Sequence, residues 1–139
     1  MEVRSHCPIN FTLEHFGDKW SFLIIRDLMF KGKRHYNEFL EAGEKVSTSV
    51  LGDRLKKLEE QGIISKSEDS VKKSRIRYSL TPKGIDLLPI LLEMIIWGGE
   101  KDSLTESPKE FMEQAINHRE NLLKEIREQL IKDHLADNN

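Results

Sequence analysis

The sequence has a single cysteine and no apolar run long enough to cross a membrane. One cysteine excludes a disulfide within the chain and favours a reducing compartment. The longest apolar run, LLPILLEMIIW at 87–97, has about half the length of a membrane-spanning helix. The first residues, MEVRSHCPINF, lack the apolar segment of a signal peptide. We therefore predict a soluble, cytoplasmic protein with no membrane partner.

The sequence also lacks the motifs of common enzyme and metal sites. It contains no glycine-rich phosphate loop and no nucleophile elbow. His6, Cys7 and His15 could be imagined as ligands, but their spacing is not that of a usual chelate, and the other histidines are scattered. We expect no catalysis, no cofactor and no metal site.

The net charge is −2, yet the charge is unevenly distributed. Residues 31–84 hold 13 Lys/Arg and 8 Asp/Glu, whereas residues 100–139 hold 6 Lys/Arg and 10 Asp/Glu. A basic middle and an acidic tail are typical of a chain in which one segment meets phosphates. Charge alone leaves open whether the basic segment binds nucleic acid or is an ordinary solvated face.

Hydrophobic spacing predicts a mainly α protein with a small β-hairpin. Helices are expected at 11–16, 18–30, 35–42 and 47–61, followed by strands within 63–67 and 74–80, a helix from 82 and another at 108–135. Helix, short helix, turn, longer helix and hairpin is the order of a winged helix-turn-helix. We predict that fold, as a dimer.

The helix at 47–61 combines a buried stripe with a polar face. Leu51, Leu55 and Leu58 recur at helical spacing. Ser47 is placed to cap the first turn, and Gly62 supplies a stop. Such a helix could be an ordinary surface helix, or it could be a recognition helix that enters a DNA groove.

The segments IISKS and SRIRYSL alternate with the period of a strand. The side chains expected on one face are those of Ile63, Ile76, Tyr78 and Leu80. The turn between them would carry Lys72, Lys73, Arg75 and Arg77. These cations could contact DNA, or they could only protect the hairpin edge from aggregation.

Two later helices carry apolar side chains that are expected to be buried against another surface. Thr81 and Pro82 should start the first, which is apolar nearly all round at 87–97 and should kink at Pro89. Ser107 and Glu110 form a capping-box pattern before the second. Its stripe, broken by Arg119, contains Met112, Ile116, Leu123, Ile126 and Leu130. Packing on its own domain and pairing with a partner both remain open.

The chain resembles the HxlR family of bacterial winged-helix transcriptional regulators over residues 7–98. The resemblance rests on CPINFTLEHFGDKWSFLIIRDL, KRHYNEFLE, VSTSVLGDRLKKLEEQGII and RYSLTPKGIDLLPILLEMIIWG, in family order. It implies a cytoplasmic homodimer that binds an operator, with an interface built from the N-terminal helix and the helices after the wing. Two features depart from the family pattern. The predicted hairpin, which would be the wing of the winged helix, lacks the proline-containing segment that the family usually has before its second strand. The tail after residue 100 is also longer than the usual end of the family's chains.

We accordingly divide the chain into a DNA-binding domain, 1–100, and a C-terminal helical extension, 101–139, for dimerisation. The expected partner is double-stranded operator DNA with an inverted repeat. The predicted DNA-binding residues are Arg34, Ser47, Thr48, Ser49, Gly52, Asp53, Arg54, Lys56, Lys72, Lys73 and Arg75. The alternative is a winged-helix module that binds proteins and not DNA. For the homodimer, an interface of Leu88, Leu91, Ile95 and Trp97 with residues 7–16 and 108–135 is expected.

The HxlR resemblance places a cysteine at Cys7, which in some members senses oxidants or electrophiles. Arg4, His6 and the following helix could favour the reactive thiolate. The alternative is a buried, inert thiol. A small-molecule or oxidant effector is therefore a hypothesis attached to Cys7.

Overall fold

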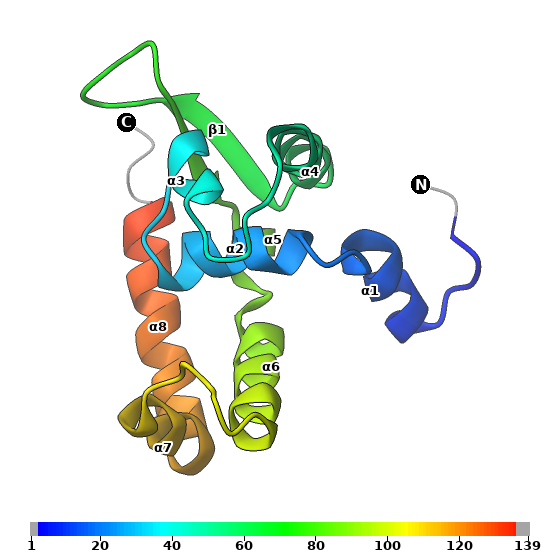
Figure 1. Cartoon of the computed structure of the whole chain (residues 1–139), viewed down its shortest axis with the longest axis vertical. Helices are drawn as coiled ribbons and strands as arrows, with labels where there is room; N and C mark the ends of the chain where they lie inside the picture. The colour runs from blue at the N-terminus through cyan, green and yellow to red at the C-terminus, as the bar shows by residue number, and fades with distance from the viewer. Residues whose placement is uncertain (1–2, 136–139) are drawn as a thin grey trace. The chain divides into compact units, whose positions relative to one another are not determined.

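A computed structural model describes residues 3–135 of the chain (Figure 1). It is mostly helical with a two-stranded antiparallel hairpin, which confirms the predicted mainly α fold with a small β-hairpin. The chain forms two compact units, one ending at Leu80 and one beginning at Thr81. The boundary expected at residue 100 stays a prediction. Among the described residues, no helix is both long and apolar enough to cross a membrane.

The first unit contains the helix-turn-helix and the hairpin. Its elements are α1 (Pro8–Phe16), α2 (Ser21–Phe30), α3 (Tyr36–Leu40), α4 (Thr48–Glu60), β1 (Ile64–Glu68) and β2 (Ile76–Leu80). Helix α1 begins earlier than predicted because Pro8 fits its first turn. Helix α2 begins later than predicted, at Ser21, because the side chain of Asp18 accepts hydrogen bonds from the Trp20 and Ser21 N–H groups.

Helix α4 has the predicted caps and core stripe. Ser47 Oγ accepts a hydrogen bond from Val50 N at 3.3 Å. Leu51, Leu55 and Leu58 are buried in the core of the unit. Gly62 adopts φ +74°, a left-handed conformation that L side chains rarely adopt. The helix therefore begins and ends close to the predicted residues.

The hairpin, hereafter the wing, comprises β1, β2 and the loop between them. Its antiparallel register pairs Ile64 with Leu80 and Glu68 with Ile76. Ile76, Tyr78 and Leu80 alternate along β2 and therefore share one face, as predicted. On that face Tyr78 and Leu80 are buried, whereas Ile76 is 46% exposed. The placement of Ile63 on this face is wrong, because β1 begins at Ile64 and it is Ile64 that pairs with Leu80.

The second unit consists of α5 (Pro82–Ile85), α6 (Leu88–Lys101), α7 (Lys109–Asn117) and α8 (Arg119–His134). Thr81 Oγ1 accepts a hydrogen bond from Gly84 N at 3.1 Å, which confirms the predicted cap. The expected kink at Pro89 is wrong, because the chain leaves the helix after α5 and Pro89 lies in the first turn of α6.

The predicted continuous helix at 108–135 is also wrong. His118, at φ −134° and ψ 44°, separates α7 from α8. The expected capping box is absent as well, since Pro108 occupies the cap position and no side chain caps α7. A Cβ on Gly99 would lie 2.7 Å from the Met112 side chain, so glycine lets α6 and α7 approach closely.

Candidate nucleic-acid interface

Helix α4 presents a polar face to solvent, opposite its buried leucines. The exposed residues of that face, hereafter the recognition face, are Ser47, Thr48, Ser49, Gly52, Asp53 and Lys56. Hydroxyl, carboxylate and ammonium groups are the side-chain groups that contact base edges and phosphates. Six of the predicted DNA-binding residues therefore share one solvent-exposed surface.

Arg54 lies beside the recognition face and is held within the fold. Its Nε lies 3.1 Å from Asp18 Oδ1, and its Nη1 pairs with Asp53. Burial would raise the pKa of Asp18, but hydrogen bonds from Ser21 and Trp20, together with Arg54, lower it to about 2. Asp18 therefore joins the start of α2 to α4 as a charged group.

A second set of contacts holds the start of α4 and the loop before it. The Tyr36 hydroxyl donates to the Thr48 carbonyl at 3.0 Å, so α3 contacts the first residue of α4. The Arg26 guanidinium contacts both carboxylate oxygens of Glu44, at 2.7 and 2.9 Å, and also donates to buried Asp27. Bidentate contacts of this kind fix the loop that leads into α4.

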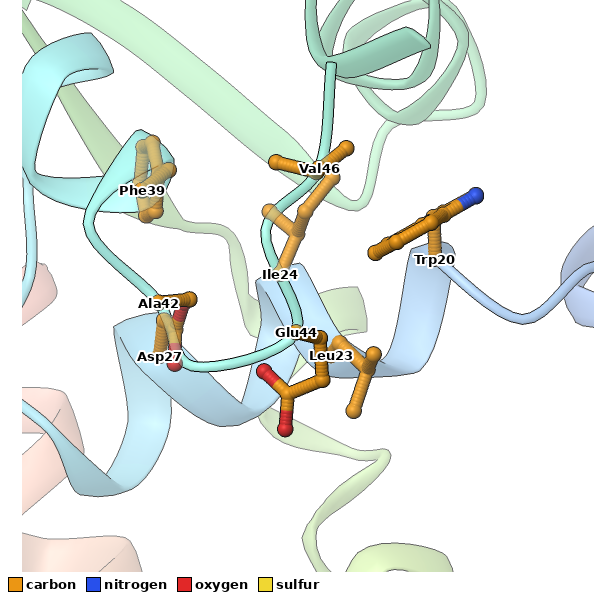
Figure 2. Close-up of a pocket in the computed structure, with 8 residues that line it drawn as sticks. All are labelled: Trp20, Leu23, Ile24, Asp27, Phe39, Ala42, Glu44 and Val46. Carbon is orange, nitrogen blue, oxygen red and sulfur yellow. The ribbon is translucent and has the colours of Figure 1, made fainter.

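A small cavity lies between α2, α3 and that loop. Figure 2 shows the side chains that line it: Trp20, Leu23, Ile24, Asp27, Phe39, Ala42, Glu44 and Val46. Its volume of about 10 Å³ leaves room for about one water molecule. It is therefore a packing gap and not a site for an effector.

The wing carries three predicted DNA-binding residues, and they differ in their surroundings. Lys72 and Lys73 are exposed, and neither ammonium group forms an ion pair within residues 3–135. Arg75 is exposed too, but its Nε lies 3.2 Å from Asp69 Oδ2. Two free positive charges thus lie in the loop of the wing.

Arg34, another predicted DNA-binding residue, contacts β2. Its Nε donates to the Tyr78 carbonyl at 2.7 Å and its Nη2 donates to Ser79 Oγ at 2.6 Å. Tyr78 N in turn donates to the Arg34 carbonyl at 2.7 Å. The guanidinium therefore connects the segment before α3 to the wing, and its contact with DNA stays a prediction.

Cys7 is exposed at the N-terminal end of α1. The backbone N–H groups of Asn10 and Ile9 lower the pKa of its thiol. Partial positive charge at a helix start favours the thiolate, which is the reactive form. Within residues 3–135, no group of three or more metal-ligating side chains could hold an ion.

Each unit also leaves apolar side chains exposed. On α1 these are Ile9, Phe11 and Leu13, and on α6 they are Ile90, Met94 and Trp97. Leu88 and Leu91 are buried within the chain, so the expectation that they form an interface is wrong. The helical period of α6 turns them away from the exposed side, which carries Trp97 at 68% exposure.

Sequence reasoning missed the residues that hold the interface in place. Asp18 and Ser21 have the spacing of a helix cap, a signal that could have been read from the sequence. The contacts of Arg34 with β2 and of Tyr36 with α4 join residues distant in sequence, and no local pattern indicates them.

Comparison with known proteins agrees with this architecture. The model of the HxlR-like helix-turn-helix family matches residues 15–106. The HTH-type transcriptional regulator sll1512 of Synechocystis sp. is 39% identical over 88 residues, which are 63% of this chain and 64% of that protein. YybR of Bacillus subtilis (strain 168), also an HTH-type transcriptional regulator, is 34% identical over 101 residues, covering 73% of this chain and 80% of YybR.

Among solved structures, the redox regulator HypR in its oxidised form is similar, with a TM-score of 0.62 and 32% identity. The similarity covers 70% of this chain and all of the HypR chain. The matched part of this chain thus extends over the whole of HypR but just under two thirds of sll1512.

Proposed function

We propose, from the premise that the chain belongs to the HxlR-like helix-turn-helix family, that it binds an inverted-repeat operator as a homodimer. It is a DNA-binding transcriptional regulator of the helix-turn-helix type. Its relatives are transcriptional regulators rather than enzymes, and we propose neither catalysis nor a cofactor for it. Acting on bacterial DNA, it would work in the cytoplasm.

The exposed polar side of α4 is the observation that carries this proposal. A major groove about 12 Å wide admits one α-helix, and the N-terminal residues of such a helix reach base edges. Ser47, Thr48 and Ser49 occupy that end, with Gly52 and Asp53 one turn further on. Arg54, Lys56 and Arg34 would contact the flanking phosphates or base edges.

The wing would add affinity with little sequence preference. Lys72 and Lys73 are exposed, and their charges are not neutralised by a carboxylate of the described residues. Lysine is a point charge suited to phosphate, and its binding releases counterions. Arg75 would take part as well, although Asp69 offsets some of its charge.

Homodimerisation would cover the exposed apolar sides of α1 and α6. Ile9 is 72% exposed and Trp97 is 68% exposed, and a solvated monomer rarely leaves extended apolar patches open. A two-fold dimer would present two copies of α4 to half-sites about one helical turn or more apart. An inverted-repeat operator follows from that symmetry.

Cys7 is the proposed sensor of oxidants or electrophiles. Its exposure and lowered pKa both favour the thiolate, and HypR is itself a redox regulator. An oxidant would remove two electrons and two protons from two thiols to form one disulfide. The second thiol would be Cys7 of the other protomer or a small thiol.

A DNA-binding titration against salt tests the proposal and its alternative together. Duplexes enriched by binding-site selection should bind, and the logarithm of affinity should fall linearly with the logarithm of salt concentration. A winged helix used only for protein contacts would enrich no sequence in the same selection. Failure to enrich any duplex with reduced, folded protein would overturn the proposed function.

A further inference from the structure

One histidine joins the helix-turn-helix to the loop of the wing. His35 immediately precedes α3, and its Nε2 lies 2.8 Å from Asp69 Oδ2. Arg75 Nη2 lies 2.6 Å from His35 Nδ1. Asp69 and Arg75 bound the loop that carries Lys72 and Lys73, so one imidazole ring contacts both ends of that loop.

The loop is closed by the same two residues. Asp69 N donates to the Arg75 carbonyl at 2.8 Å, and Arg75 Nε lies 3.2 Å from Asp69 Oδ2. Val71 N donates to Asp69 Oδ1 at 2.8 Å. The Val71 N–H group and, more weakly, His35 lower the pKa of Asp69, so its carboxylate is charged where it meets the imidazole.

His35 is itself fixed on its own side. Its backbone N–H donates to Glu38 Oε1 at 2.9 Å, and the same oxygen lies 2.7 Å from the ring Nδ1. The groups that face the ring are thus Glu38 from α3 with Asp69 and Arg75 from the wing. The His35 side chain is only 15% exposed, unlike the lysines between its two wing contacts.

The contacts of His35 with the loop would help to hold the wing in place. A two-stranded hairpin alone is marginally stable in water. Arg34 holds β2 at Tyr78 and Ser79, toward the base of the wing. The next residue, His35, contacts the loop at Asp69 and Arg75.

We propose that His35 is a positioning residue for DNA binding, which sets the direction of Lys72 and Lys73 by holding Asp69 and Arg75 against α3. This inference rests on the proposed DNA-binding function. His35 itself need not touch DNA. Its effect on affinity must therefore pass through the two lysines.

The first test measures the loop without DNA. Amide hydrogen exchange of free wild type is compared with that of His35→Ala, and Asn37→Ala, which changes an exposed residue of α3, is the matched control. We expect the Asp69, Val71 and Arg75 amides to exchange about fivefold to tenfold faster in His35→Ala only. Unchanged exchange would overturn the proposal.

A second variant guards against general unfolding. If the buried amides of α4 also exchange faster in His35→Ala, His35→Asn replaces it, because asparagine suits the position that begins α3 but is too short to replace the Nε2 contact with Asp69. Faster exchange confined to the loop in His35→Asn supports the proposal. Loop exchange equal to that of wild type overturns it.

The third test asks whether His35 acts through the lysines. His35→Ala should weaken binding to a selected duplex about fivefold to tenfold in the wild type, and hardly at all when Lys72 and Lys73 are already alanine. Equal losses in both backgrounds would overturn the inference. If wild type bound no DNA, the proposed function would fail, and loop exchange alone would decide whether His35 positions the wing.

Discussion

Arg54 Nε on α4 lies 3.1 Å from Asp18 Oδ1, and the Asp18 carboxylate also accepts hydrogen bonds from the start of α2. One carboxylate therefore caps one helix of the helix-turn-helix and orients the next. Its charge matters to this arrangement because hydrogen bonds and Arg54 lower its pKa to about 2.

Replacing Asp18 with asparagine should destabilise the fold in a pH-dependent way. Because the folded pKa lies below the ordinary 3.8, ionised Asp18 stabilises the fold above about pH 4, and this contribution is lost as the pH falls toward 2. Asparagine keeps the capping oxygen and removes the charge. We expect a loss of about 1 kcal/mol at neutral pH, allowing for solvent screening, that shrinks in acid.

Urea unfolding followed by circular dichroism at several pH values measures this difference. Asp53→Asn is the matched control, since Asp53 pairs with the same Arg54 but has a side chain that is 66% exposed. Its stability should match wild type at every pH. A pH-independent loss in Asp18→Asn would contradict the account of the charge.

Changes on the recognition face should alter sequence preference. The double variant Ser49→Ala, Asp53→Ala removes a hydroxyl and a carboxylate that can contact base edges. We expect discrimination at the contacted positions to fall by about tenfold or more in a binding-site selection. Glu60→Ala, at the other end of α4, is the control and should retain the wild-type preference. An unchanged sequence preference in the double variant would mean that other residues contact the bases.

Changes at the wing should alter affinity without altering preference. Lys72→Ala, Lys73→Ala should weaken binding to all duplexes by a similar factor. The slope of log affinity against log salt should flatten by about 1.8, roughly 0.9 for each lost phosphate contact. Lys124→Ala, Lys132→Ala removes the same charge from exposed positions of α8 and serves as control. A salt-dependence slope equal to that of the control would mean that the wing does not contact DNA.

Oxidation should change DNA affinity through Cys7. Diamide accepts two electrons and two protons from a pair of thiols and leaves a disulfide. We expect diamide to shift the gel-shift midpoint of wild type by severalfold, reversibly with dithiothreitol, because the exposed thiol has a lowered pKa. Cys7→Ser should not respond. Identical behaviour of the two proteins would mean that Cys7 is not the sensor.

Local patterns predicted α4 closely because its signals are contained within it. The stripe of Leu51, Leu55 and Leu58, with Ser47 and Gly62 at the ends, needs no knowledge of the rest of the chain. The exposed side of α4 follows from the same periodicity, so the residues of the recognition face could be identified from the sequence.

Other features depend on contacts that periodicity does not contain. The break at His118 interrupts a stripe that continues on both sides of it, so spacing alone predicted one helix. The junction of His35 with Asp69 and Arg75 joins residues more than thirty positions apart. Leu88 and Trp97 are both apolar, and only the packing of α6 shows which of them is buried.

The mass of the complex with a selected operator duplex tests the central claim most directly. Light scattering coupled to gel filtration should give the duplex plus two chains of 16.2 kDa. Trp97→Asp should reduce this stoichiometry because it charges the exposed apolar side of α6, whereas Leu104→Asp, on an exposed apolar residue outside α1, α6 and the wing, should leave the mass of the complex unchanged. The account predicts two chains on each inverted repeat. One chain per duplex, bound with full sequence preference, would contradict it.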